Sequence, residues 1–249
     1  MASLSNHEAQ LALACGLELE FLIRPKHETI PQLTQKGWDA NLKPDCQDGE
    51  RKNENRTIMR KEIAENIVKL NVDASVRANN YDSWSIVDER TLDEREIFVR
   101  YLSSVDPWNR VVSVLILLCL GRVEIVSRAL WTDEEWKLEI DRVYSALHNG
   151  WDLLLTPGCA MHTHVSPGIG KRFTLAQVKW ILKWISLFDG AITKIMPAHR
   201  KDNAWAMSNF RSAQAPSKWR TLFEAIETES FDKLFKEIDE MKMISDGLP

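Results

Sequence analysis

Apolar residues near the start of the chain are interrupted by acids at alternate positions. In the stretch CGLELEF, residues 15–21, Glu18 and Glu20 are separated by a single leucine. Because successive side chains of a strand point to opposite faces, the two glutamates would share one face of the strand and the apolar residues the other. We therefore predict a buried strand over residues 13–23. A carboxylate facing a packed interior needs a positive partner, which this segment alone does not supply.

Three later segments have the apolar or alternating pattern that is typical of strands. They are WSIVD at 84–88, GRVEIVSRAL at 121–130, and CAMHTHVSPG, which ends at Pro167 and Gly168. In the second segment Val123 and Ile125 share one face, and Glu124 points to the other.

Helical spacing of apolar residues predicts helices between and after these strands. One helix is expected over 57–70, with Ile58, Ile63, Ile67 and Leu70 on a common face. A capping box of Thr132 and Glu135 is expected to begin a second helix, which Gly150 ends.

Thr174 and Gln177 form the pattern of another capping box and are expected to open a long helix that ends before Pro197. The apolar residues expected to face inward from it are Leu175, Val178, Leu182, Ile185 and Ile192. One or two amphipathic helices are expected over 217–244.

Strands and helices are mixed without a βαβ alternation, which favours an α+β fold with a largely antiparallel sheet over a doubly wound one. We predict one domain over residues 1–249. The polar run from about 24 to 56 includes DCQDGERKNENR and three prolines, and it is expected to be an insertion or a mobile loop.

Charge and cysteine usage narrow the class of protein. The net charge is −4, so neither nucleic acid nor a membrane is an expected partner. The four cysteines do not have CxxC spacing, and no apolar run is long enough to span a bilayer. We expect a soluble, cytoplasmic protein with reduced thiols. Neither a P-loop nor a GxGxxG sequence is present, and the sequence gives no oligomeric state.

The acids on the predicted strands are the first candidates for chemistry. Glu18 and Glu20 would lie roughly 6 to 7 Å apart along one strand, a spacing that suits hard oxygen ligands of Mg²⁺. The alternative is a solvated strand face. Glu124 and Asp88 extend the pattern to two other strands, and each could equally be a surface acid in an ion pair.

Two histidines and an arginine are the other candidates. His162 and His164 share a strand face, so they could hold a transition metal such as zinc in a hydrolase, form a hydrogen-bonded pair in a polar groove, or contact a phosphorylated intermediate. Arg200, in the polar loop of MPAHRKDN, could bind a phosphate. Alternatively, it could lie there only because the dipole at a helix C-terminus favours basic residues.

The order of these segments resembles the amidoligase family found in fungi and bacteria. The resemblance covers about residues 13–209, and its most specific parts are VEIVSRAL and GCAMHTHV, each followed by a long helix. That family is related to glutamine synthetase and to the glutamate–cysteine ligases, which join a carboxylate to an amine or ammonia. The resemblance therefore implies a glutamine synthetase-like catalytic domain.

The resemblance also implies roles for the candidate residues. Glu18, Glu20 and Glu124 would bind Mg²⁺, and Asp88 would lie near the metal or the amine substrate. His162 and His164 would line the part of the site that holds ATP or the acyl phosphate, and Arg200 would contact the transferred phosphate. His162, Asp88 and Arg200 would be the catalytic residues. The substrates would be a small carboxylate and an amine, activated through an acyl phosphate.

One feature of the family pattern does not occur in this sequence. The family continues to a strand of the type T-x-E-F-R, whereas this chain ends after FDKLFKEIDEMKMI at Pro249. The alternative function is therefore a non-catalytic amidoligase-like binding protein or a truncated gene product.

Overall fold

The computed structural model describes residues 13–42, 48–76, 82–89, 121–132, 134–156, 158–198, 224, 226–227, 230–234 and 236. The chain forms two compact units, residues 1–170 and 171–249. The first unit holds a sheet and its helices, and the second holds a long helix. Each unit is described by itself.

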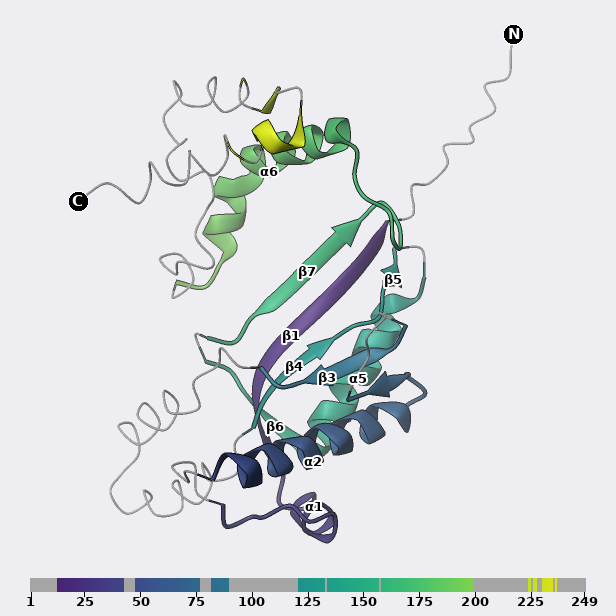
Figure 1. The fold of residues 1–249 in the computed structure, drawn as a ribbon, viewed down its shortest axis with the longest axis vertical. Coiled ribbons are helices and arrows are strands. Elements are labelled where there is room, and N and C mark those ends of the chain that lie inside the picture. The colour runs from purple at the N-terminus through teal and green to yellow at the C-terminus, as the bar shows by residue number, and fades with distance from the viewer. Residues whose placement is uncertain are drawn as a thin grey trace, which may run out of the picture. The chain divides into compact units, whose positions relative to one another are not determined.

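The first unit is built on a mostly antiparallel sheet of seven described strands (Figure 1). The strands are β1 (Ala14–Pro25), β2 (Ala74–Ser75), β3 (Trp84–Val87), β4 (Gly121–Val126), β5 (Leu130–Trp131), β6 (Trp151–Leu154) and β7 (Met161–Ser166). Only β2 and β3 pair in parallel; the other pairings are antiparallel. The α+β class is confirmed, and so are strands within 13–23, 84–88, 121–130 and 159–168, although the third of these ends at Val126.

Strand β1 is the centre of the sheet because it pairs with four other strands. It pairs with β4 and β5 along one edge and with β6 and β7 along the other. The amide of Ser127 donates to the carbonyl of Leu17 on the first edge, at 2.8 Å. The amide of Glu20 donates to the carbonyl of Ala160 on the second edge, at 2.9 Å. Successive residues of β1 thus direct their backbone N–H and C=O groups alternately toward one neighbouring strand and the other.

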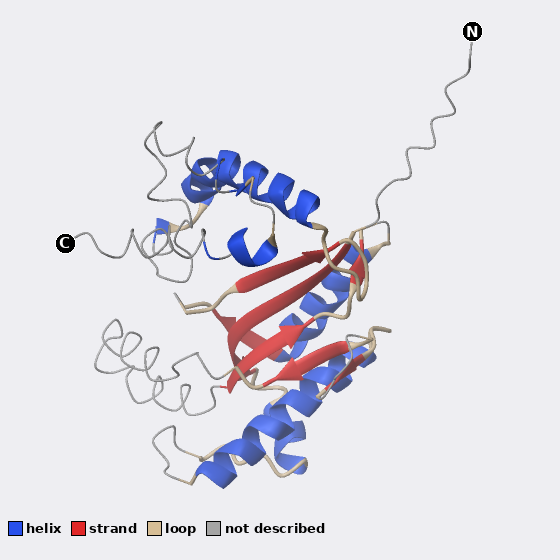
Figure 2. Cartoon of the chain, turned by 45° about the horizontal axis from the view of Figure 1, so that its top comes forward, coloured by secondary structure: helices blue, strands red, loops and turns tan. Residues whose placement is uncertain are grey.

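Helices α2 (Gly49–Val68) and α5 (Trp136–Gly150) cover the apolar face of this sheet, and the short helix α1 (Ile30–Gln35) packs against α2. Figures 1 and 2 show α2 and α5 running along the same side of the strands. The core between them includes Leu19, Ile125, Ile63, Leu147 and Trp151, all nearly inaccessible to solvent. The opposite face of the sheet carries the acids and histidines.

The polar segment from 24 to 56 is more regular than the expected insertion or mobile loop. It contains the end of β1, all of α1 and the beginning of α2, while residues 43–47 lie outside the described part. The Asp48 side chain begins α2 by accepting hydrogen bonds from the amides of Glu50 and Arg51, both at 3.1 Å. An N-cap of this kind starts a helix even where few apolar residues mark it.

The capping box expected from Thr132 and Glu135 is wrong. Helix α5 begins at Trp136, and its N-cap residue Glu135 makes no capping hydrogen bond with its side chain. Thr132 instead exchanges hydrogen bonds with Leu13: its hydroxyl accepts from the Leu13 amide at 3.1 Å, and its amide donates to the Leu13 carbonyl at 2.9 Å. Pairing with the chain beside β1 therefore takes the hydroxyl away from the helix. The expected end at Gly150 is confirmed.

The second unit contains α6 (Leu175–Ile195), which begins as expected with the capping box of Thr174 and Gln177. Ile185 and Ile192, expected to face inward, are 43% and 48% exposed, so that part of the expectation is wrong. Lys183 forms an ion pair with Glu227. Most of the helices expected over 217–244 lie outside the described residues. Among the described helices, none is both long enough and apolar enough to cross a membrane.

Candidate functional site

Three acids from two neighbouring strands meet on the polar face of the sheet. Glu18 and Glu20 come from β1, and Glu124 comes from β4. Glu20 lies directly opposite Glu124 in the β1–β4 register. The Ser127–Leu17 hydrogen bond fixes the alternation, so Glu20 and Glu124 form a non-hydrogen-bonded pair, in which facing side chains are closest. The prediction that Glu18 and Glu20 share a face is confirmed, and the register places Glu124 on the same face.

The two histidines of β7 face the same acids from the other edge of β1. His162 lies opposite Glu18, and His164 lies opposite Gly16. His162 Nδ1 is 3.2 Å from Glu18 Oε2 and 3.6 Å from Glu20 Oε1, and His164 Nε2 is 3.1 Å from Glu18 Oε1. The imidazoles are thus the partners of the glutamates of β1, and they are among the more exposed groups of this cluster.

Burial and like charges act together on Glu124. Desolvation raises the pKa of Glu124 to about 7, with further contributions from the negative charges of Glu89, Glu18 and Glu20. The positive charge of His162 opposes this shift. A carboxyl group with a pKa near neutrality is partly protonated at pH 7, and it loses the proton readily to a base or when a cation binds the carboxylate.

Glu18 behaves in the opposite way, although it lies on the same face. Burial by itself would raise the pKa of Glu18, but the hydrogen bonds from His164 and His162 outweigh it and lower the pKa. Glu18 is therefore an ionised acceptor, while Glu124 is an acid that shares its surroundings with three other carboxylates. Groups whose environments separate their pKa values in this way are typical of sites that transfer protons or bind cations.

Asp88 directly follows Val87, which lies opposite Glu124 in the β3–β4 register, but the Asp88 carboxylate contacts arginines. Its Oδ2 is 3.5 Å from Arg122 Nη2, and its Oδ1 is 3.9 Å from Arg56 Nε. The next residue, Glu89, is a buried acid whose negative charge, like that of Glu20, raises the pKa of Glu124. Glu89 is not among the site residues predicted from the sequence, and the only sequence signal for it is its position directly after the strand. Arg56 lies on α2, and nothing in its polar surroundings indicated a contact with Asp88.

Arg200 lies outside the described residues, so its predicted contact with phosphate stays a prediction. Cys159 is half-buried, and its Sγ accepts a hydrogen bond from the Thr156 amide at 3.3 Å.

The donor set suits a hard cation, but it does not form a complete metal cage. Among the described residues, no group of three or more histidine, cysteine, aspartate or glutamate side chains is arranged to hold a metal ion. Zinc sites need three or four protein ligands, so the described part gives no support to a zinc hydrolase built on His162 and His164. Mg²⁺ is commonly held by one or two carboxylates with water and substrate phosphates. The carboxylates present therefore fit Mg²⁺ arriving with a phosphate ligand.

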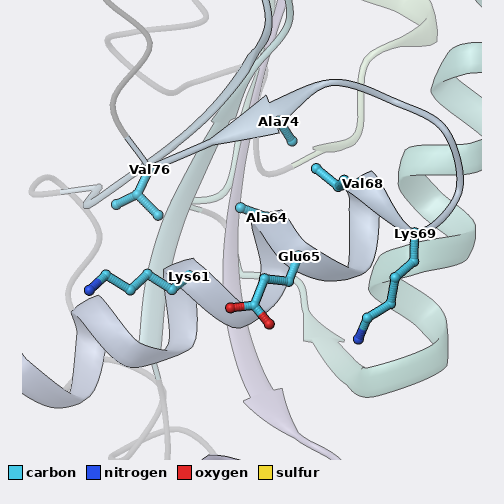
Figure 3. A pocket seen from close by; sticks show the side chains of 7 residues that line it. All are labelled: Lys61, Ala64, Glu65, Val68, Lys69, Ala74 and Val76. Carbon is cyan, nitrogen blue, oxygen red and sulfur yellow. The ribbon is translucent and has the colours of Figure 1, made fainter. Parts of the chain in front are cut away.

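A separate hollow lies between α2 and β2 and is not lined by the glutamates and histidines of the cluster (Figure 3). It has a volume of about 410 Å³ and is lined by Lys61, Ala64, Glu65, Val68, Lys69, Ala74 and Val76. Its lining contains none of the residues that the sequence predicts to be functional. We therefore place the candidate site on the polar sheet face, at the glutamates and histidines of β1, β4 and β7.

Comparison of the chain with protein families, with curated proteins and with solved structures finds no match.

Proposed function

We propose that the protein is an ATP- and Mg²⁺-dependent ligase of the amidoligase type, which joins a small carboxylate to an amine or ammonia. The observation that carries the proposal is the acidic cluster of Glu18, Glu20 and Glu124 on one face of an antiparallel sheet, bordered by His162 and His164. The motif resemblance supplies the reaction class, and a glutamine synthetase-like fold is part of the same proposal.

The electrostatics of the cluster support a divalent cation. Desolvation is the larger cause of the raised pKa of Glu124, and the negative charges of Glu89, Glu18 and Glu20 raise it further. A cation placed among these groups would relieve this repulsion. Glu18 and Glu20 offer oxygen ligands, which Mg²⁺ prefers. When bound with ATP, Mg²⁺ would neutralise the phosphate charge that repels an incoming carboxylate.

In the proposed reaction, a substrate carboxylate oxygen attacks the γ-phosphorus of ATP, the bond to the β-phosphate oxygen breaks, and ADP leaves. The amine nitrogen then attacks the acyl phosphate, and phosphate leaves as the amide forms. The nitrogen must lose a proton in this step, and an acidic residue beside the amine could accept it. The motif resemblance assigns the position near the metal or the amine substrate to Asp88.

The histidines would act at the phosphate side of the site. His162 and His164 are exposed beside the acids and have ring nitrogens that can donate hydrogen bonds. His162 contacts both Glu18 and Glu20, so it would also hold these two carboxylates in place. Arg200 remains the predicted contact of the transferred phosphate.

The first test is calorimetric titration of ATP into the full chain, with Mg²⁺ and with EDTA. We expect binding that depends on Mg²⁺, and we expect Glu18→Gln to weaken it at least about tenfold, equivalent to roughly 1.4 kcal/mol. Glutamine keeps the size of the side chain but removes the negative charge. The matched control is Glu28→Gln, a change of the same kind at an exposed residue away from the cluster.

Equal binding by wild type and Glu18→Gln, with both folded by circular dichroism, would exclude Glu18 as a metal ligand. If wild type binds no nucleotide with Mg²⁺ present, the ligase proposal fails. If it binds Mg·ATP, a screen of carboxylate and amine pairs for ADP release decides between a ligase and a binding protein.

A further inference from the structure

Strand β7 is an edge strand in the described part of the sheet. Among the described residues it pairs only with β1, and five of its six residues are exposed. Met161 and Val165 are 65% and 50% exposed, although both are apolar. Natural sheet edges are usually protected by lysine, other charges or proline. The strand itself, MHTHVS, contains no lysine, arginine, aspartate, glutamate or proline.

The backbone of β7 offers hydrogen bonds on its outer side at alternate residues. Glu20 donates to Ala160, so the β1–β7 hydrogen bonds continue at the pairs of Glu18 with His162 and Gly16 with His164. The amide and carbonyl groups of the residues in between must point away from β1. These residues are Met161, Thr163 and Val165.

An antiparallel copy of the same strand matches this edge in one register. A two-fold axis perpendicular to the sheet keeps each side chain on its own face, so facing residues must come from the same face. If the axis passes beside Thr163, then Thr163 faces the partner's Thr163, and Met161 faces the partner's Val165. All the outward-pointing groups then pair, in about six hydrogen bonds.

We propose that β7 is the interface for a second copy of this chain, which extends the sheet across a two-fold axis at Thr163. The pairing places the exposed apolar residues Met161 and Val165 against each other on one face. On the other face, His162 lies opposite the partner's His164, so each acid and histidine cluster borders a residue of the partner. The proposal rests on the sheet geometry and does not depend on the ligase function.

The charges of the two clusters are compatible with this pairing. The strand contains no lysine, arginine, aspartate or glutamate, so no permanent like charges face each other. Where His162 faces the partner's His164, Glu18 lies 3.2 Å from His162 and 3.1 Å from His164 and offsets a positive charge on either imidazole. The glutamates of the two β1 strands would lie three strand spacings apart, roughly 14 Å. That separation exceeds the Debye length of about 8 Å at physiological ionic strength, so their repulsion is largely screened.

The test is light scattering on the full chain and on variants of Thr163, which faces its own counterpart only in the proposed register. We expect wild type to be a dimer and Thr163→Lys and Thr163→Glu each to be monomers, because each brings two like charges together. An equimolar mixture of the two variants should form a heterodimer. Thr163→Val keeps the amide and the β-branched shape, so it should remain a dimer.

Circular dichroism establishes that each variant keeps its fold, since Thr163 is exposed and its outward amide makes no bond to β1. A monomeric wild type would overturn the proposal. So would a dimer that persists in Thr163→Lys, or a mixture of the charged variants that stays monomeric. Loss of ATP binding with dimerisation intact would contradict only the proposed function.

Discussion

Glu124 combines the two effects that make a carboxyl group hard to ionise. It is partly removed from water, and it lies opposite Glu20 and near Glu18 and Glu89. The folded state therefore binds its proton more tightly than the unfolded state, with a pKa of about 7 against 4.5. Between these values stability falls as the pH rises, and above pH 7 the full penalty is present.

Glu124→Gln should consequently stabilise the protein most above pH 7 and progressively less toward pH 4.5. Because the group is partly exposed and its repulsions are screened, we expect about 1 kcal/mol at pH 8, or roughly 2–4 °C in Tm. Thermal unfolding in the absence of divalent cations at pH 5, 6, 7 and 8 measures it. The control is Glu28→Gln. A variant that is less stable than wild type at pH 8 would contradict the unfavourable environment of Glu124.

The residues of the site were predictable to the extent that they follow strand alternation. Glu18, Glu20, His162 and His164 were identified because residues two apart on a strand share a face. The sequence could not predict that both histidines face Glu18, because that depends on the register between β1 and β7. Nor could it predict that Asp88 forms ion pairs with Arg122 and Arg56, or that the charge of Glu89 raises the pKa of Glu124. These interactions join residues that are distant in the sequence.

Helix α5 is attached to the sheet by a hydrogen-bonded carboxylate as well as by its apolar face. Glu139 accepts from the indole nitrogen of the fully buried Trp84 at 2.6 Å, and from Arg128 Nη2 at 2.8 Å and Nε at 2.9 Å. One side chain thus connects α5 with β3 and with the segment after β4. Hydrogen bonds to charged groups are the stronger ones, at about 1.5–3 kcal/mol each.

Glu139→Ala should therefore destabilise the first unit by about 2 kcal/mol, because it leaves the Trp84 indole N–H without its acceptor. The expected fall in Tm is roughly 4–8 °C. Asp141→Ala, an exposed acid on the same helix, should change stability by no more than about 0.5 kcal/mol. Urea unfolding of both variants makes the comparison. Equal stabilities would show that the network contributes nothing to holding α5.

Local patterns predicted the long elements better than the short ones. Strands β1, β3, β4 and β7 and helix α6 were expected from alternation, helical spacing and the Thr174 cap. The two-residue strands β2 and β5 exist only because a partner strand lies beside them, so no local pattern marks them. The Thr132 cap failed for a related reason, since pairing with Leu13 is a tertiary contact.

At the scale of the whole molecule, the candidate site uses strands from one compact unit. The described members of the cluster all lie between residues 18 and 164, within the unit of residues 1–170. Helix α6 belongs to the other unit. A ligand bound at the glutamates and histidines should therefore protect the two units unequally.

Hydrogen exchange measured by mass spectrometry should show this difference. Adding ATP with Mg²⁺ should slow exchange in peptides that cover β1, β4 and β7, because a ligand that binds only the folded state reduces opening of the elements it contacts. Peptides covering Leu175–Ile195 should be protected less than those of β1. The same nucleotide with EDTA is the control. Protection confined to α6 would place the ligand elsewhere.

The central position of β1 has a consequence for how the protein is made. A ribosome synthesises β1 before all of its partners, which lie between residues 121 and 166. At about 5–20 residues per second, the nascent strand must wait several seconds or more for them. An apolar strand without partners is prone to aggregate, and charged residues within it oppose this. Glu18 and Glu20 are therefore expected to act as gatekeepers during synthesis, before they contribute to any site.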